Sequence, residues 1–185
     1  EHAIAGYAVG IRLEQILLLP VLGVTGALLP IVAQNFGAGD YARVRSALFL
    51  CWRIGLVMMA IAMPTLWFLG RSILTLFTDD PEVIRIGASY LAVDGFILPV
   101  YVMLFAINSL LQALKKPVWT LWIGVYRQGF GVLFFSYIFV RLFDLGVWGV
   151  WFGIAVAVTT GFVLSLWVAE RVSGRLMGGL FRRPQ

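Results

Sequence analysis

Charged residues are scarce in this sequence. Asp, Glu, Lys and Arg make up 12% of its 185 residues, half of the roughly 25% found in soluble globular domains. Hydrophobic residue types reach 61%, and the mean hydropathy is +0.94. A water-soluble fold of this size could not cover so much apolar surface with so few charges, and a disordered chain would be far more polar. The composition therefore predicts an integral membrane protein.

Residues that build catalytic and metal sites are also rare. The single cysteine, Cys51, excludes an internal disulfide and a thiolate metal cluster, and the single histidine, His2, leaves little for a metal centre. The sequence has no Gly-x-Ser-x-Gly, no phosphate-binding glycine loop and no His-Glu-x-x-His motif. An intramembrane hydrolase needs a nucleophile with its base, or a metal ion. We therefore expect neither an enzyme nor a cofactor.

Long apolar stretches dominate what is present. A helix needs about 20 apolar residues to cross a bilayer core of about 30 Å. Five stretches meet this length and predict an all-α integral membrane protein with about five transmembrane helices within residues 1–170: 13–34, 47–70, 86–114, 117–140 and 145–169. Asp40 and Asp80 precede two of these helices and are the expected N-caps. Gly149 and Gly153, four residues apart, predict a close contact between helices.

Lysine and arginine are divided unevenly between the two ends of these helices. The 14 basic residues outnumber the nine acidic ones, for a net charge of +5, but they are scattered, which indicates membrane topology and not nucleic-acid binding. One side carries eight of them: Arg43, Arg45, Lys115, Lys116, Arg171, Arg175, Arg182 and Arg183. The other side carries four: Arg12, Arg71, Arg85 and Arg141. The excess predicts a basic cytoplasmic tail, residues 171–185, on a multi-pass plasma (inner) membrane protein.

The beginning of the sequence predicts that more chain precedes it. Residue 1 is Glu1, with neither an initiating methionine nor a basic leader segment. Five crossings that end in the cytoplasm place Glu1 outside, and an external start without a leader requires an earlier membrane span. We therefore expect an upstream part of the same protein.

Two charged side chains lie deep inside the predicted spans. Asp94 is nine residues past Arg85, about 14 Å from the outer side at about 1.5 Å per residue. Arg127 is ten residues past Pro117, about 15 Å from the inner side by the same rise. These depths coincide in a core of about 30 Å, which predicts that Asp94 and Arg127 face each other. In one interpretation Asp94 binds a proton or Na⁺ in exchange with substrate, and Arg127 tunes the pKa of Asp94. In the other, the two residues form a buried ion pair that only fixes helix packing.

Other polar side chains in the spans are further candidates for a binding cavity. Glu14 lies near the outer edge of its span, where it either bonds to Arg12 or lines an outward vestibule. The remaining polar residues either line a cavity or form hydrogen bonds between helices: Gln34, Asn108, Gln112, Gln128, Tyr90, Tyr101 and Tyr126.

Several short motifs resemble those of a transporter family. They are QNFGAG at 34–39, LFTDDPEV at 76–83 followed by Tyr90-Leu91, LQALKKP at 111–117, Arg127-Gln128, and GVWGVW at 146–151. In this order and spacing they resemble the C-terminal lobe of the multidrug and toxic compound extrusion (MATE) family of the MOP flippase superfamily. The resemblance implies a twelve-helix transporter of two six-helix lobes. The five spans then correspond to helices 8–12, and residues 1–10 to the end of helix 7.

The resemblance also implies a function. Family members export cationic or amphipathic drug-like compounds in exchange for H⁺ or Na⁺, which here implies three partners: such small molecules, the lipid bilayer and the missing N-terminal lobe. The coupling acid on helix 10 of NorM-like members aligns nearer Leu104 than Asp94, so the resemblance does not assign that role to Asp94. Two alternatives stay open. They are a lipid-linked precursor flippase of the same superfamily and a non-transporting five-span scaffold or subunit.

Overall fold

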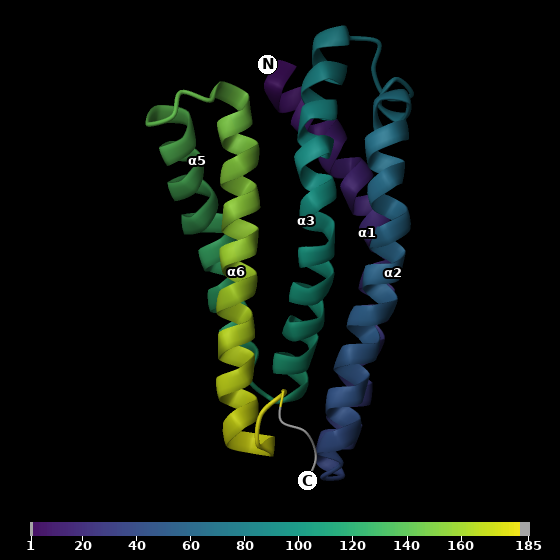
Figure 1. The fold of residues 1–185 in the computed structure, drawn as a ribbon, viewed down its shortest axis with the longest axis vertical. Helices are drawn as coiled ribbons and strands as arrows, with labels where there is room; N and C mark the ends of the chain where they lie inside the picture. The colour runs from purple at the N-terminus through teal and green to yellow at the C-terminus, as the bar shows by residue number, and fades with distance from the viewer. Residues whose placement is uncertain (1, 182–185) are drawn as a thin grey trace.

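The computed structural model describes residues 2–181, and this part of the chain consists of helices and their connections (Figure 1). The segments are α1 (His2–Gly37), α2 (Tyr41–Leu74), α3 (Pro81–Ala113), α4 (Pro117–Val125), the π-helix η1 (Tyr126–Gly131), α5 (Val132–Arg141) and α6 (Gly146–Met177). α4, η1 and α5 follow one another without interruption and form one crossing. Five helices of the described part are therefore long and apolar enough to cross a membrane, which confirms the predicted fold class.

Two acidic side chains begin helices as predicted. Asp40 accepts a hydrogen bond from the backbone N–H of Arg43 at 3.0 Å. Asp80 accepts hydrogen bonds from the backbone N–H groups of Glu82 and Val83, at 2.8 and 3.3 Å. These bonds satisfy donors that have no partner within the first turn of a helix, and the bond from Glu82 in particular holds the pKa of Asp80 below its usual range. Both predicted N-caps are confirmed.

The central helix of the bundle is α3. It contacts α1, α2 and α6, whereas α5 packs mainly against α6. Buried residues occur along the whole of α3, and α5 has none. In Figure 1 the start of α1 and the α2–α3 and α5–α6 connections lie at the upper end of the bundle, and the α3–α4 connection and the end of α6 lie at the lower end.

α5 and α6 approach each other closely at glycines of α6. A Cβ built on Gly153 would lie 2.5 Å from the backbone nitrogen of Ser136, and one built on Gly149 would lie 2.9 Å from the backbone nitrogen of Val140. Real Cβ atoms do not come this close to a backbone atom, so the contact requires residues without a side chain. The predicted close contact at Gly149 and Gly153 is confirmed.

Gly153→Ala is expected to lower the free energy of unfolding by about 1–3 kcal/mol, because the added methyl group forces α5 away from α6. Gly124→Ala is the matched control, since nothing lies within 4 Å of a Cβ built there and alanine is the better helix former. The measurement is thermal unfolding of both variants in one detergent. Equal melting temperatures would contradict the packing argument.

The first helix is longer than the sequence predicts. α1 runs unbroken through residues 2–37, whereas the span was expected to start at residue 13, with 1–10 belonging to the preceding helix. That assignment is wrong for the described residues 2–10. The charges of Arg12 and Glu14 were read as a membrane edge, but they do not interrupt the helix. Arg12 is exposed and Glu14 is buried against α3, so both are accommodated within one continuous α1.

The last helix also extends beyond the predicted membrane boundary. α6 continues past residue 171, the expected start of the tail, as far as Met177. Gly178 follows with a φ of 79° and ends the helix in the left-handed conformation that glycine adopts without strain. The end of the predicted basic tail, 182–185, and residue 1 lie outside the described residues.

Candidate functional site

A cavity of about 680 Å³ lies between α1, α3, η1, α5 and α6. Five of the residues proposed from the sequence line it: Glu14, Tyr90, Tyr101, Arg127 and Gln128. The rest of its wall is mostly apolar or aromatic: Tyr7, Ile11, Gln15, Leu18, Leu19, Leu22, Phe105, Val132, Ile154 and Val158. A few polar groups in a largely apolar wall, at this volume, are typical of a site for a small organic molecule.

A buried hydrogen bond at this cavity links α1 to α3. The hydroxyl of Tyr90 donates to the carboxylate of Glu14, and the two residues are 3% and 6% exposed. The ring of Tyr90 fits against α1 because Gly10 has no side chain, since a Cβ built there would lie 2.6 Å from the ring. Trp151 of α6 packs on the same ring with centroids 5.1 Å apart. Of the two alternatives for Glu14, the structure therefore favours lining a cavity over bonding to Arg12.

Asp94 is the least satisfied acidic group near this cavity. It lies one helical turn beyond Tyr90 on α3 and is 1% exposed. Neither of its carboxylate oxygens has a hydrogen-bond partner within the part of the chain that the structure describes. A buried carboxylate that is charged and unpaired costs several kcal/mol. We therefore expect Asp94 to hold a proton or a cation whenever it is enclosed as it is here.

The predicted pairing of Asp94 with Arg127 is wrong. No salt bridge joins them among residues 2–181, and the guanidinium of Arg127 lies instead 5.4 Å from the centroid of the Tyr101 ring. Tyr101 is seven residues beyond Asp94 on α3, about 10 Å along the axis at about 1.5 Å per residue. Counting residues from the span ends estimates the depth of the Arg127 backbone. The long side chain, however, places its charge at the level of Tyr101.

The π-helical turn η1 positions two neighbouring polar residues at the cavity. A π-helix has a wider turn than an α-helix and is frequent at functional sites, and here both Arg127 and Gln128 line the cavity. The side chain of Arg127 crosses α6 at Gly161, where a built Cβ would lie 3.3 Å from three of its carbon atoms. Its Nε has no hydrogen-bond partner among the described residues. The guanidinium therefore has an unsatisfied donor at a residue that lines the cavity.

Sequence reasoning missed both this π-helical turn and the contribution of Tyr7. Tyr7 stacks on Trp151 with ring centroids 5.6 Å apart and contacts the ring of Tyr90 edge-on at 5.1 Å. Its spacing of seven residues from Glu14 places both on one face of α1, which is a signal that was available. The π-turn has a weaker signal, because a mid-span glycine such as Gly129 is equally compatible with an ordinary transmembrane α-helix.

Four other polar candidates lie outside this cavity. Gln34 and Gln112 are exposed, and Asn108 is half-buried. Each of the three lies on a part of α1 or α3 that continues past the cavity toward the lower end. Because a helix rises about 1.5 Å per residue, these residues are too far along the helix axis to line the cavity. Tyr126 instead donates a hydrogen bond from its hydroxyl to Thr160 at 3.1 Å, which joins η1 to α6. Of the two alternatives expected from the sequence, Tyr126 therefore forms a hydrogen bond between helices and does not line the cavity.

Comparison with known families agrees with this architecture. Residues 1–138 match the family model described as MatE. The chain belongs to the MatE family. This confirms the resemblance seen in its motifs, and members of the family are multi-pass membrane transporters of small molecules.

Curated relatives in the MatE family carry related names. A FAD transporter of Shewanella oneidensis is 33% identical over 69% of this chain and 28% of that protein. The probable multidrug resistance protein YpnP of Bacillus subtilis is 27% identical over 80% of this chain and 34% of that protein. The multidrug export protein MepA of Staphylococcus haemolyticus is 24% identical over 95% of this chain and 38% of that protein. The chain thus spans about a third of the length of these relatives.

Solved structures of MATE transporters share the fold. An outward-facing multidrug resistance MATE transporter superposes with a TM-score of 0.86 at 20% identity, over 94% of this chain and 39% of that one. An inward-facing one gives a TM-score of 0.85 at 19% identity, over 94% and 42% of the two chains. A MOP superfamily transporter from Pyrococcus furiosus gives 0.88 at 19% identity, over 99% and 40%. The five-helix arrangement is therefore that of part of a MATE transporter.

Proposed function

We propose that this chain is part of an efflux transporter that exports cationic or amphipathic compounds by antiport with H⁺ or Na⁺. The observation that carries the proposal is the pair of buried acidic groups beside the cavity. Glu14 lines the cavity and accepts a hydrogen bond from Tyr90. Asp94 lies one turn beyond Tyr90 on α3, and neither of its carboxylate oxygens has a hydrogen-bond partner within the described residues. Relatives named for multidrug resistance or export support the substrate class.

Antiport follows from competition for this negative charge. A buried carboxyl is tolerated in the membrane when a proton or Na⁺ neutralises it. A cationic substrate in the cavity offers Glu14 a different neutralising charge, so substrate and coupling ion favour each other's release. The aromatic and leucine side chains of the wall suit flat, apolar ligands of varied shape. The proposed cycle involves no covalent step and needs no resident cofactor.

The distribution of basic residues supports a cytoplasmic lower end. The helix ends and connections there carry the larger group: Arg43, Arg45, Lys115, Lys116, Arg171 and Arg175. The upper end carries the smaller one: Arg71, Arg85 and Arg141. Under the positive-inside rule the end of α6 then faces the cytoplasm, and we propose the plasma (inner) membrane as the location.

Family membership and the cavity both weaken the alternatives. A non-transporting scaffold is not supported by a chain whose family consists of transporters. A flippase for lipid-linked precursors is expected to offer several cations to the substrate phosphates. Arg127 is the only cationic side chain among the residues that line the cavity.

One observation favours a second candidate substrate, an anionic aromatic compound such as FAD. Arg127 lies over the ring of Tyr101 and its Nε has no partner in the described part of the chain, an arrangement that suits a phosphate and a stacked ring. The relative from Shewanella oneidensis that is named as a FAD transporter supports this candidate.

Substituting Arg127 separates the two substrate classes. With a cationic substrate, Arg127→Gln removes a repulsive charge, so export of ethidium by the whole protein is expected to continue at least at the unsubstituted rate. With FAD as substrate, the lost charged hydrogen bond is expected to reduce export about tenfold or more. The measurement is the initial export rate of each compound from proteoliposomes. Export of FAD but not ethidium by the unsubstituted protein would contradict the proposed substrate class.

Arg53→Gln is the matched control for this experiment. Arg53 is exposed on α2 and does not line the cavity, but its substitution removes the same charge. Its export rates are expected to equal those of the unsubstituted protein for both compounds. An equal effect of the two substitutions would point to net charge and not to the cavity.

A further inference from the structure

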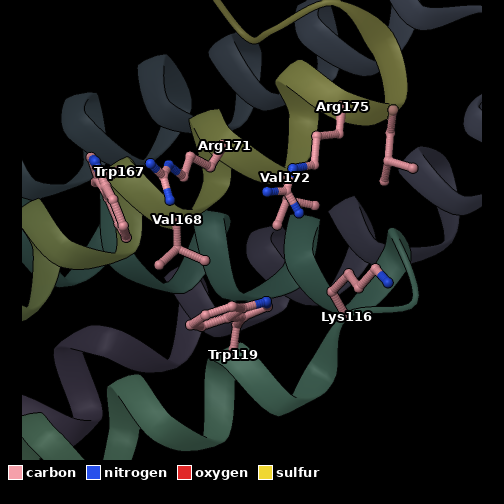
Figure 2. A pocket seen from close by; sticks show the side chains of 8 residues that line it. Lys116, Trp119, Trp167, Val168, Arg171, Val172 and Arg175 are labelled. Carbon is pink, nitrogen blue, oxygen red and sulfur yellow. The ribbon is translucent and has the colours of Figure 1, made fainter.

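A second, smaller cavity lies at the lower end, away from the proposed transport site. It is a groove of about 240 Å³ between the start of α4 and the last turns of α6, lined by Lys116, Trp119, Trp167, Val168, Arg171, Val172, Arg175 and Leu176. Figure 2 shows Lys116 and Trp119 on one side of the groove and Val168, Val172 and Arg175 on the other. The groove thus lies between two helices, α4 and α6, that are far apart in the sequence.

The groove is positively charged and has no acidic residue in its lining. None of Lys116, Arg171 and Arg175 forms a salt bridge within residues 2–181. The nearest acid on α6, Glu170, does not line the groove, and its carboxylate accepts a hydrogen bond from the backbone N–H of Leu180 at 2.8 Å. Within the described part of the chain no carboxylate therefore pairs directly with these three cations, and the lining suits an anionic ligand.

The groove also has a polar and an apolar part. Lys116 directly precedes α4 and Arg175 lies two residues before the end of α6, so both are at the lower margin of membrane-length helices. Trp119, Trp167 and Val168 lie farther into the same helices. Tryptophan at this depth is typical of the membrane–water interface. Charge at the margin and apolar surface behind it match an amphiphile with an anionic head.

The start of α4 and the position of Arg171 both favour an anion in the groove. α4 starts at Pro117 with no side chain bonded to its first turn, and the partial positive charge at the start of a helix favours a nearby anion. Arg171 lies over the ring of Trp167 at 4.6 Å, which holds its guanidinium beside the groove.

We propose that this groove binds the headgroup of an acidic phospholipid of the surrounding membrane. Lys116 and Arg175 contact the headgroup phosphate from opposite sides, and an acyl chain lies over Trp119 and Val168. Basic pockets between transmembrane helices bind anionic lipid headgroups in this way. The proposal does not depend on the transported substrate or on the coupling ion.

Native mass spectrometry of the whole protein tests this proposal. The purified protein is titrated with dioleoyl-phosphatidylglycerol and, separately, with dioleoyl-phosphatidylethanolamine, which has no net charge. We expect one tight site for phosphatidylglycerol that is weakened about tenfold or more in the double variant K116Q/R175Q. Equal affinity of the unsubstituted protein for the two lipids would overturn the proposal.

Matched variants separate this groove from general surface charge. R43Q/K115Q removes two exposed positive charges at the same end, from residues that do not line the groove, and is expected to leave the affinity within about twofold. Equal weakening in the two double variants would overturn the proposal. K116R/R175K keeps both charges and is expected to bind normally, whereas loss of binding there would contradict an electrostatic site.

Millimolar inorganic phosphate distinguishes the lipid from free phosphate. Phosphate alone lacks the acyl chains that contact Trp119 and Val168, so it is expected not to displace phosphatidylglycerol. Complete displacement by inorganic phosphate would identify the groove as a phosphate site and overturn the lipid assignment.

Discussion

Replacing Asp94 with asparagine is expected to abolish the dependence of export on the H⁺ or Na⁺ gradient while leaving the fold intact. Asparagine has nearly the shape of aspartate but neither releases a proton nor neutralises Na⁺. The fold loses no hydrogen bond, because neither oxygen of Asp94 has a partner among residues 2–181. We expect gradient-driven export to fall about tenfold or more, since a coupling free energy of about 1.4 kcal/mol already corresponds to a factor of ten.

The measurement uses the whole protein in proteoliposomes, with ethidium export followed under an imposed pH or Na⁺ gradient. Asp144→Asn is the matched control, because Asp144 is exposed in the α5–α6 connection. Its φ of 51° is also tolerated by asparagine. Thermal unfolding of both variants shows whether the fold is kept. Unchanged rate and gradient dependence in Asp94→Asn would falsify the coupling role and leave Asp94 a packing role only.

Substitutions at the Glu14–Tyr90 hydrogen bond are expected to have the second largest effect, on both stability and export. Tyr90→Phe leaves the buried carboxylate of Glu14 without the donor it has now, which costs about 1–3 kcal/mol of stability. Glu14→Gln is expected to cost less, because the amide oxygen still accepts the hydrogen bond from Tyr90. The same change removes the charge, however, so export of a cationic substrate is expected to drop about tenfold or more.

These two substitutions and their combination form a double-mutant cycle. Thermal unfolding measures the coupling energy of the pair, and ethidium export measures the effect of the charge. Tyr137→Phe is the control, since Tyr137 is 65% exposed on α5 and is expected to change neither quantity. Should Glu14→Gln export ethidium as well as the unsubstituted protein, Glu14 would serve only to link α1 with α3.

Glu14 and Asp94 thus differ in their hydrogen-bond partners and in their position relative to the cavity. Glu14 has a donor on the neighbouring helix and faces the cavity, so its removal affects both packing and substrate. Asp94 has no bonded partner in the described chain and does not line the cavity, so its removal affects charge alone. A transport assay combined with a stability assay therefore distinguishes a coupling group from a structural one at each position.

Much of the fold could be predicted because its causes are local. Five apolar stretches of sufficient length become membrane-length helices whatever their neighbours, since lipid offers backbone groups no other partner. Asp40 and Asp80 cap helices because their side chains reach N–H groups two or three residues away. Gly153 allows a close helix contact because it lacks a side chain. None of these outcomes requires knowing which helices are neighbours.

The candidate site was only partly predictable. Polar groups are conspicuous in apolar spans, and the structure brings five of the residues named for this reason to one cavity: Glu14, Tyr90, Tyr101, Arg127 and Gln128. The pairing of Asp94 with a basic residue was wrong, because residue counts give depth but neither helix rotation nor the reach of a side chain.

The sequence by itself determined the number of spans, their caps, the family and the scarcity of charge, because these follow from composition and from contacts between near neighbours in the chain. Only the tertiary structure decided that Glu14 bonds to Tyr90 across two helices, and that Arg127 reaches Tyr101 and not Asp94. It also decided that Lys116 and Arg175 share one groove. Each of these depends on how rigid helices rotate and pack against one another, which hydrophobicity leaves undetermined when nearly every face of a helix is apolar.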